Sequence, residues 1–301
     1  MLIPPPLTAG ARVAIVSPAG PLRGEHELAR AIDNVRALGW EAAPGNHVLA
    51  RRGYFAGSDE QRLRDLDGAI GSDRIDGIWC ARGGYGVLRL LEHIDYPALR
   101  RRPKAIIGYS DITALHSAVA VQAGVVSFHG PTARAPLSAF SRDSLERAIG
   151  RGEDPCGAAP GARVLRAGRA RGPLHGGNLA LLAALCGTPF AVAMEDSILV
   201  LEDVGEAVYR IDRMLQQLRL SGALRGCRGI VAGHFTDCPE RADDGERRLD
   251  DVLTELAEAL DVPCVAGVPI GHIDEQWTVP LGRVGELIAE EHEVVVSIGA
   301  S

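Results

Sequence analysis

The sequence predicts an α/β protein with a mostly parallel sheet in its N-terminal half. Short apolar runs alternate with segments of helical periodicity over roughly the first 140 residues. Segments that alternate in this way fold as parallel strands covered by helices. At 301 residues the chain is longer than one hydrophobic core normally supports, which predicts a second domain.

Local patterns predict the elements of the first half in order. The expected strands are the apolar runs at 11–16, 77–80, 105–107 and 125–128. The expected helices are 25–38, a helix that begins at Ser58, a helical piece at 87–92, and 111–124. Ser58 is followed three residues later by Gln61, which is the spacing of a capping box. Gly39 and Gly124 end the helices that precede them.

The composition changes at residues 150–173, which are rich in Gly, Pro, Ala and Arg and have no sustained periodicity. These residues are predicted to connect an N-terminal domain (1–149) to a C-terminal domain (174–301). In the second domain, helices are expected after Gly176-Gly177-Asn178, ending near Gly187, and at 209–220. Strands are expected at 198–201, 229–232, 264–268, 286–289 and 294–298.

Composition and charge exclude several classes of protein. The net charge is −7, the 31 arginines are balanced by acids, and aromatic residues make up 4%, so no nucleic-acid partner is expected. The N-terminus lacks the features of a signal peptide, which predicts a cytoplasmic protein. Residues 112–133 lack Asp, Glu, Lys and Arg, but Gly124 interrupts them, so they predict a helix and a strand and no membrane segment. The six cysteines show no C-x-x-C spacing, which favours reduced, buried thiols.

Ser110 is the first candidate for a catalytic residue. It follows the apolar run 105–107 and Gly108, and a helical segment begins at Asp111. A serine on such a strand-to-helix corner presents its hydroxyl above the sheet edge, and the backbone amide of the next residue is free to bind an oxyanion. Serine at a helix start also serves simply as a cap, and the pattern alone leaves both roles open.

Ser17 also follows a strand, but its next residue is Pro18, which has no amide hydrogen to donate. Ser110 is therefore the better nucleophile, with the amide of Asp111 as one oxyanion donor. A second donor is expected from the glycine turn 83–84, at the end of a neighbouring strand. The alternatives for residues 82–86 are a plain turn or a phosphate loop, and the spacing fits a phosphate loop poorly.

A nucleophilic serine needs a general base and an acid that orients it. Of nine histidines, His129, His234 and His272 follow apolar runs, and spacing does not choose among them. His234 lies near an Asp and a Cys, but no matching ligand pair indicates a metal site. Glu202 ends the apolar strand 198–201 and is the candidate acid; the alternative is a structural acid paired with an arginine such as Arg210 or Arg213.

Six ordered sequence blocks together carry a family resemblance. The blocks are residues 13–20 (VAIVSPAG), 82–86 (RGGYG), 108–111 (GYSD), 176–178 (GGN), 201–206 (LEDVGE) with 209–213 (YRIDR), and 271–272 (GH) with Gln276 and 280–282 (PLG). They resemble the LD-carboxypeptidases, also called muramoyltetrapeptide carboxypeptidases, from near residue 12 to near residue 283. Val208 and Ile270 depart from the family pattern, which has proline and often an aromatic residue there.

The resemblance implies a serine peptidase with a Ser-Glu-His triad, which in this sequence is Ser110, Glu202 and His272. It implies a Rossmann-like nucleophile domain and a second, β-rich α/β domain that brings the glutamate and the histidine to a cleft. The oxyanion donors would be the amides of Gly84 and Asp111. The resemblance also implies a homodimer without metal or organic cofactor.

The activity implied by the resemblance is hydrolysis of the L,D-peptide bond that releases terminal D-alanine from murein tetrapeptides during cytosolic cell-wall recycling. The free substrate carboxylate needs a cation, for which Arg82, Arg134 and Arg210 are candidates. Trp277 is a candidate pocket residue or a buried core residue.

Two alternatives remain from the sequence. A related subgroup hydrolyses peptidyl nucleotides of the microcin C type and tends to carry an extra loop with a stacking aromatic, which this compact chain lacks. A non-catalytic two-domain binding protein would also use a cleft between domains, but it would not need Ser110, Glu202 and His272 together.

Overall fold

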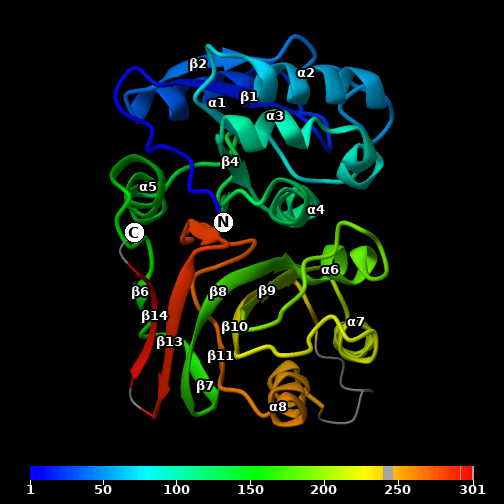
Figure 1. Cartoon of the computed structure of the whole chain (residues 1–301), viewed down its shortest axis with the longest axis vertical. Helices are drawn as coiled ribbons and strands as arrows, with labels where there is room; N and C mark the ends of the chain where they lie inside the picture. The colour runs from blue at the N-terminus through cyan, green and yellow to red at the C-terminus, as the bar shows by residue number, and fades with distance from the viewer. Residues whose placement is uncertain (240–246, 292, 300–301) are drawn as a thin grey trace.

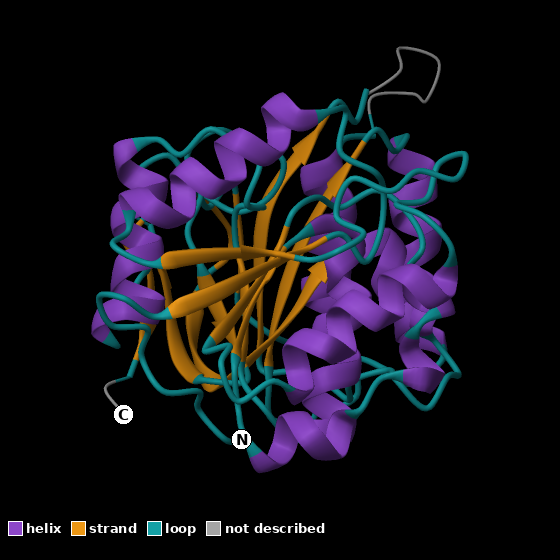
Figure 2. Cartoon of the chain, turned by 90° about the horizontal axis from the view of Figure 1, so that it is seen from above, coloured by secondary structure: helices purple, strands orange, loops and turns teal. Residues whose placement is uncertain are grey.

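The computed structural model describes residues 1–239, 247–291 and 293–299 and shows two β-sheets arranged along the long axis of the molecule (Figure 1). The first sheet has the strand order β12-β5-β4-β3-β1-β2, and the second has the order β6-β14-β13-β8-β9-β10-β11-β7. Seen from above, helices flank the strands at both sides of the molecule (Figure 2). The predicted class, a mostly parallel α/β sheet followed by a β-rich α/β part, is confirmed.

The first sheet is built from short strands with buried residues on both faces. Its strands are β1 (Arg12–Val16), β2 (Glu41–Pro44), β3 (Gly77–Cys80), β4 (Ala105–Gly108), β5 (Ser127–His129) and β12 (Val279–Leu281). Strands β1 to β5 pair in parallel, and β12 is antiparallel to β5. The four predicted strands overlap β1, β3, β4 and β5. The sequence EAAP of β2 lacks the β-branched residues that predict a strand.

Helices cover both faces of the first sheet. They are α1 (Glu25–Ala37), α2 (Asp59–Gly71), α3 (Tyr96–Arg101), α4 (Thr113–Ala118) and α5 (Ala139–Leu145). Along β1, Val13 and Ile15 pack with α1, whereas Ala14 and Val16 pack with α2. This alternation explains why an apolar run forms the strand, since a parallel sheet buries both its faces. The predicted helical piece 87–92 forms two 3₁₀ turns, Val87–Arg89 and Leu91–His93.

Helix α2 is capped at both ends by side chains. The predicted capping box of Ser58 and Gln61 is present at its N-terminus. At its C-terminus, the Nζ atom of Lys104 donates hydrogen bonds to the carbonyls of Ala69 (2.7 Å) and Ser72 (2.6 Å). Lys104 is the only lysine in the sequence and is buried, and this burial lowers the pKa of its ammonium to about 8.

The second sheet is mixed and is covered by helices on one face (Figure 1). Its strands are β6 (Gly157–Ala158), β7 (Arg163–Arg166), β8 (Gly168–Asn178), β9 (Ile198–Val204), β10 (Gly229–Thr236), β11 (Cys264–Ala266), β13 (Val284–Glu290) and β14 (Glu293–Ile298). The helices are α6 (Leu179–Leu185), α7 (Val208–Leu220) and α8 (Leu249–Leu260). Leu199 and Leu201 of β9 face these helices, whereas Ile198 and Val200 pack on the other side with β13 and β14.

The predicted connection at 150–173 differs from the structure, because residues 157–173 contribute β6, β7 and the first part of β8 to the second sheet. One glycine of the predicted linker, Gly172, serves close packing: a Cβ atom there would lie 2.1 Å from the Asp196 carbonyl oxygen. Further along β8, a Cβ atom on Gly176 would lie 2.0 Å from the Val200 carbonyl oxygen. Residues 300–301 of the predicted second domain lie outside the described residues.

The structure also bears on the sequence predictions about membrane segments and cysteines. In the parts of the chain that the structure describes, no helix combines the length and the apolar character that a membrane span needs. All six cysteines are free thiols, and Cys80, Cys156, Cys227 and Cys264 are buried. Burial raises the pKa of Cys80 to about 12, so this thiol stays protonated at neutral pH.

The strand pairing predicts opposite effects for two alanine substitutions. Gly176→Ala should lower the free energy of unfolding by more than about 2 kcal/mol, because its Cβ collides with β9. Gly68→Ala should raise it by about 0.5–1 kcal/mol, because Gly68 is exposed in α2 with open space around it. Urea unfolding of both variants measures the difference. Equal stability of the two variants would contradict the close contact between β8 and β9.

Candidate active site

Ser110 stands at the corner between β4 and α4, as predicted. Its backbone φ is +65°, in the left-handed region that residues other than glycine rarely adopt. Strained backbone of this kind at a strand-to-helix turn is the geometry of a nucleophile elbow. No side-chain cap hydrogen bond forms at the start of the 3₁₀ turn Ser110–Ile112 or of α4. The capping alternative for Ser110 therefore finds no support in these contacts.

The loop 82–87 after β3 lies against this corner. A Cβ atom on Gly83 would be 2.8 Å from the Cβ of Ser110 and 3.1 Å from its Oγ, so the two backbones approach closely. At the far end of the loop, the Val87 amide donates a hydrogen bond of 2.9 Å to Oδ2 of the buried Asp111. Burial raises the pKa of the Asp111 carboxyl to about 6, although the hydrogen bond from the Val87 amide opposes the rise. The loop is thus held to the corner at both of its ends.

Glu202 and His272 form a hydrogen-bonded pair. Glu202, on β9, is fully buried, and its Oε2 lies 2.8 Å from Nδ1 of His272 in the loop after β11. A carboxylate can only accept, so the Nδ1–H group donates, and Nε2 is free to accept a proton. Gly271, with φ of +118°, allows the close approach, because a Cβ there would lie 3.2 Å from Oε2 of Glu202. The pair has the geometry of a base oriented by an acid.

Tyr109 brings this pair to the nucleophile corner. It directly precedes Ser110, and its ring packs edge-on against the His272 ring with centroids 4.8 Å apart. Burial and the negative charge of Glu202 raise the pKa of the Tyr109 hydroxyl. No hydrogen bond links Ser110 to His272 in the described parts of the chain, and such bonds are often long before substrate binds. The Glu202–His272 pair therefore lies beside Tyr109, the residue that directly precedes Ser110.

The chain after His272 is fastened to the first domain. The amide of Gln276 donates to Oγ of Ser141 (2.9 Å), and the amide of Thr278 donates to Oγ of Ser144 (2.8 Å). Immediately afterwards, β12 joins the first sheet by pairing with β5. These contacts hold the His272 loop, which leaves the second sheet, beside the carboxyl ends of the first-sheet strands.

The rival residues have other surroundings. The buried Ser17 hydroxyl donates to the Val48 carbonyl at 2.9 Å. His129 is fully buried beneath Tyr109, and burial, together with the nearby His116 and His272, lowers its pKa to about 3. Because a base must reach the substrate, His129 does not suit that role. The exposed His234 has its pKa lowered by partial burial and by Arg163.

The structure also gives the surroundings of the other side chains that the sequence singled out. Glu202 pairs with His272 rather than with the alternative partners Arg210 or Arg213. Arg210 lies 3.6 Å from Glu206 on an exposed surface. Trp277 is only 3% exposed and belongs to the core of the second sheet, which favours the structural interpretation of this residue.

Sequence reasoning missed the residues that join the two sheets at the site. The Asn178 amide donates to Oγ1 of Thr113 (3.0 Å), and its side chain donates to Asp203 (2.9 Å), next to Glu202. A Cβ on Gly177 would lie 2.6 Å from the same Thr113 oxygen. The block Gly-Gly-Asn was the available signal, since two glycines before a polar residue indicate a close backbone approach.

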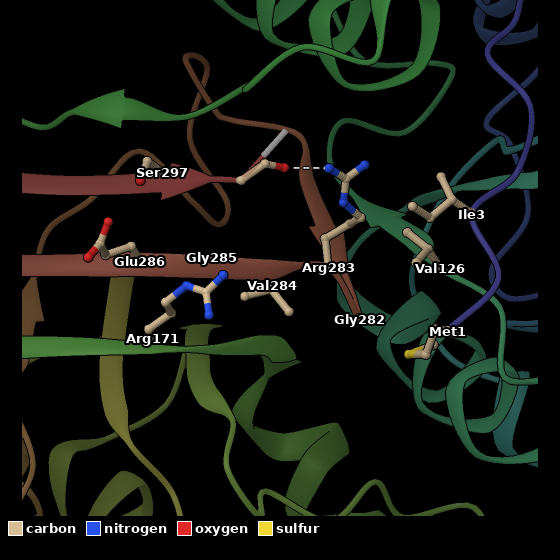
Figure 3. A pocket seen from close by; sticks show the side chains of 11 residues that line it. Met1, Ile3, Val126, Arg171, Gly282, Arg283, Val284, Gly285, Glu286 and Ser297 are labelled. Carbon is tan, nitrogen blue, oxygen red and sulfur yellow. Dashed lines mark hydrogen bonds between the residues drawn. The ribbon is translucent and has the colours of Figure 1, made fainter. Parts of the chain in front are cut away.

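One pocket on the surface lies elsewhere in the molecule (Figure 3). Its lining includes Met1 and Ile3 from the N-terminal segment and Arg171 and Glu286 from neighbouring strands of the second sheet. Arg283, also in its wall, donates to the Gly299 carbonyl. None of the predicted site residues lines this pocket, so it is not where the chemistry of Ser110 is expected.

Buried histidines predict a pH dependence of stability. Burial lowers the pKa of His116 and His175 to about 4 and that of His129 to about 3, below the unfolded value of about 6.5. Unfolding below pH 6.5 therefore takes up protons, and stability falls as the pH falls, by about 1.4 kcal/mol per pH unit for each histidine.

Histidine NMR at pH 5.5 should show these three rings neutral. Protonation of the three rings at pH 5.5 in the folded protein would contradict their burial.

Comparisons with known proteins agree with the geometry of this site. A putative carboxypeptidase of Streptomyces coelicolor is 41% identical over 95% of this chain and 93% of its own. The murein tetrapeptide carboxypeptidase of Pseudomonas aeruginosa is 37% identical over 92% of each chain. The crystal structure of the muramoyltetrapeptide carboxypeptidase from Oxalobacter formigenes is 31% identical with a TM-score of 0.85, and the match covers 96% of this chain and 99% of that one.

A more distant relative, the microcin C7 self-immunity protein of Escherichia coli, is 24% identical over 93% of this chain and 91% of its own. Family models match both halves of the sequence: an LD-carboxypeptidase N-terminal domain at residues 13–130 and an LD-carboxypeptidase C-terminal domain at residues 171–287. With both domain models matched in order, and with a serine corner that meets a Glu-His pair between the sheets, this chain belongs to the LD-carboxypeptidase family.

Proposed function

We propose that this protein is a serine peptidase that hydrolyses the L,D-peptide bond before the terminal D-alanine of murein tetrapeptides, in cytosolic cell-wall recycling. One observation carries the proposal: the Glu202–His272 pair meets the strained Ser110 corner through Tyr109. The names of the relatives from Pseudomonas aeruginosa and Oxalobacter formigenes support this class of substrate.

The proposed reaction follows from the hydrogen-bonding roles of the three residues. Nε2 of His272 would take the proton of the Ser110 hydroxyl as its oxygen attacks the substrate carbonyl. The buried Glu202 carboxylate would stabilise the imidazolium that forms. His272 would then give the proton to the departing D-alanine amine, and water would hydrolyse the acyl-enzyme by the same proton transfers in reverse order.

The amides of Asp111 and Gly84 are the proposed oxyanion donors. The Gly83 carbonyl accepts a hydrogen bond from the Gly20 amide (3.0 Å), which belongs to the loop after β1. In a trans peptide the N–H of the next residue points the opposite way, so the Gly84 amide points away from Gly20. Since β3 lies between β1 and β4, that direction is the side on which Ser110 lies. This orientation supports Gly84 as a donor.

Replacing Ser110 by alanine tests the proposed activity. Wild-type protein should release D-alanine from a murein tetrapeptide, and Ser110→Ala should lower the rate by about 10⁴- to 10⁶-fold, because the nucleophile is lost. Ser17→Ala is the matched control and should keep the activity, since Ser17 bonds to Val48 inside the core.

Absence of D-alanine release by the wild type, or equal release by Ser110→Ala, would rule out the proposal. A parallel assay with a peptidyl adenylate tests the microcin-type alternative, and substrate binding without turnover would indicate a binding protein. Light scattering tests the homodimer that the family resemblance predicts.

Replacing Gly83 by alanine tests the contact between the loop and the nucleophile. The new Cβ would lie 2.8 Å from the Cβ of Ser110, so the serine must shift, and kcat should fall by about 100-fold or more. Gly68→Ala, in an exposed part of α2, should leave kcat unchanged. Normal activity of Gly83→Ala would show that the loop moves away from Ser110 in solution.

A further inference from the structure

Two arginines lie at the carboxyl edge of the first sheet, the edge on which Ser110 stands. Arg82 follows β3 and directly precedes Gly83, the residue whose backbone lies against Ser110. Arg134 follows β5, and its amide donates to the Ala81 carbonyl at 3.3 Å, which brings it next to Arg82. The carboxyl ends of neighbouring parallel strands form the ligand-binding edge of such sheets.

One buried carboxylate is shared by this region. Glu27, at the start of α1, accepts from Nη1 of Arg134 (2.8 Å) and from the Arg23 amide (2.8 Å). Burial alone would raise the pKa of Glu27. The hydrogen bond from the Arg23 amide and the guanidinium groups of Arg134 and Arg82 outweigh this effect and hold the pKa of Glu27 below its usual value. Glu27 therefore stays ionised and fixes the Arg134 side chain.

The positive charge around Arg82 exceeds the negative charge. Burial and the charges of Arg134, Arg23 and Arg51 lower the pKa of Arg82, and only Glu27 acts in the opposite direction. The charges acting on Arg82 are thus three guanidinium groups and one carboxylate. Among the described residues Arg82 has no ion-pair partner; its Nη1 donates to the neutral carbonyl of Pro21 (2.7 Å).

Hydrogen-bond donors also remain unused there. The buried Nε of Arg134 has no hydrogen-bond partner in the described parts of the chain. Each guanidinium carries five N–H donors in a planar fork that suits a carboxylate, and buried donors without partners need an explanation. Burial and Glu202 raise the pKa of Tyr109, whose ring contacts His272, and the positive charge of Arg134 opposes this rise, so this charge acts beside the predicted active site.

We propose that Arg82 and Arg134 bind the free C-terminal carboxylate of the residue that the enzyme releases. This inference rests on the proposed function and adds how the chain end of the substrate is selected. An anionic group held beside Gly83 places the last peptide bond, and not an internal one, next to Ser110. The pair would therefore make the enzyme a carboxypeptidase. Arg210, the third cation considered from the sequence, lies beside Glu206 and is already neutralised.

Paired substrates test this role without any variant. Tripeptide formation is measured with a murein tetrapeptide that has a free C-terminal carboxylate and with the same peptide amidated at its C-terminus. The wild type should prefer the free acid by about 10- to 100-fold in kcat/KM, because the neutral amide offers the guanidinium groups one acceptor oxygen instead of two and no negative charge. The preference should arise mainly in KM, since the carboxylate is bound equally before and during the reaction.

Arg82→Gln should lower kcat/KM for the free acid by a similar factor and leave kcat/KM for the amidated peptide unchanged, so that the preference for the acid disappears. Arg82→Lys should restore part of it, because a charge remains without the planar fork. Arg82 is the better residue to change, since Arg134→Gln would leave the buried Glu27 unpaired. Arg89→Gln, which removes an exposed arginine paired with Asp59, is the matched control and should change neither substrate.

The outcomes separate the two levels of inference. Three results would overturn the role of Arg82 and leave the proposed peptidase activity standing. The wild type could cleave the acid and the amide at equal rates, or Arg82→Gln could lose activity equally with both substrates. The preference for the acid could also be lost in Arg210→Gln instead. No tripeptide from either substrate would overturn the peptidase activity and the carboxylate site with it. If Arg82→Gln does not fold, Arg82→Lys decides the proposal: a smaller preference for the acid with an unchanged kcat/KM for the amide supports the role of Arg82, and an unchanged preference overturns it.

Discussion

The hydrogen bond between Glu202 and His272 is the interaction on which the site depends. A fully buried carboxylate costs several kcal/mol unless it is paired or hydrogen-bonded. Oε2 of Glu202 has His272 as its partner, whereas Oε1 has none within the described residues. The cost of burying Glu202 therefore favours one ring orientation of His272. Because the two ring nitrogens lie on opposite sides of the imidazole, Nε2 is then directed away from Glu202.

Contacts between the two sheets support this geometry. The His272 loop leaves the second sheet, but the hydroxyls of Ser141 and Ser144 bind the chain that follows it, and β12 then pairs with β5. On the other side of the site, Thr113 binds the Asn178 amide at the end of β8. These backbone and side-chain bonds join the two sheets on both sides of the Ser110 corner, and so connect the element that carries the base to the element that carries the nucleophile.

The sequence predicted what depends on local pattern and missed what depends on packing between distant segments. Apolar runs located β1, β3 and β4, and the strand-to-helix context located Ser110, because these signals lie within a few residues. The first part of β8 was predicted to be a linker, since its sequence has no apolar alternation. Spacing left His129, His234 and His272 equal as bases, and the family resemblance indicated His272. The fold supplies the physical reason, by burying His129 and placing His272 on Glu202.

Charge is distributed in a way that links recognition to the position of the nucleophile. The chain as a whole carries −7, so its average field repels an anionic peptide. The arginines around Arg82 reverse the sign locally, and at physiological ionic strength such a field extends only about 8 Å. A substrate carboxylate is thus attracted strongly only when it is already near the loop that contacts Ser110. Because Arg82 and Gly83 are neighbours in one loop, any shift that moves the cation also moves the backbone beside the nucleophile. Binding of the chain end and alignment of its last peptide bond are therefore one structural event.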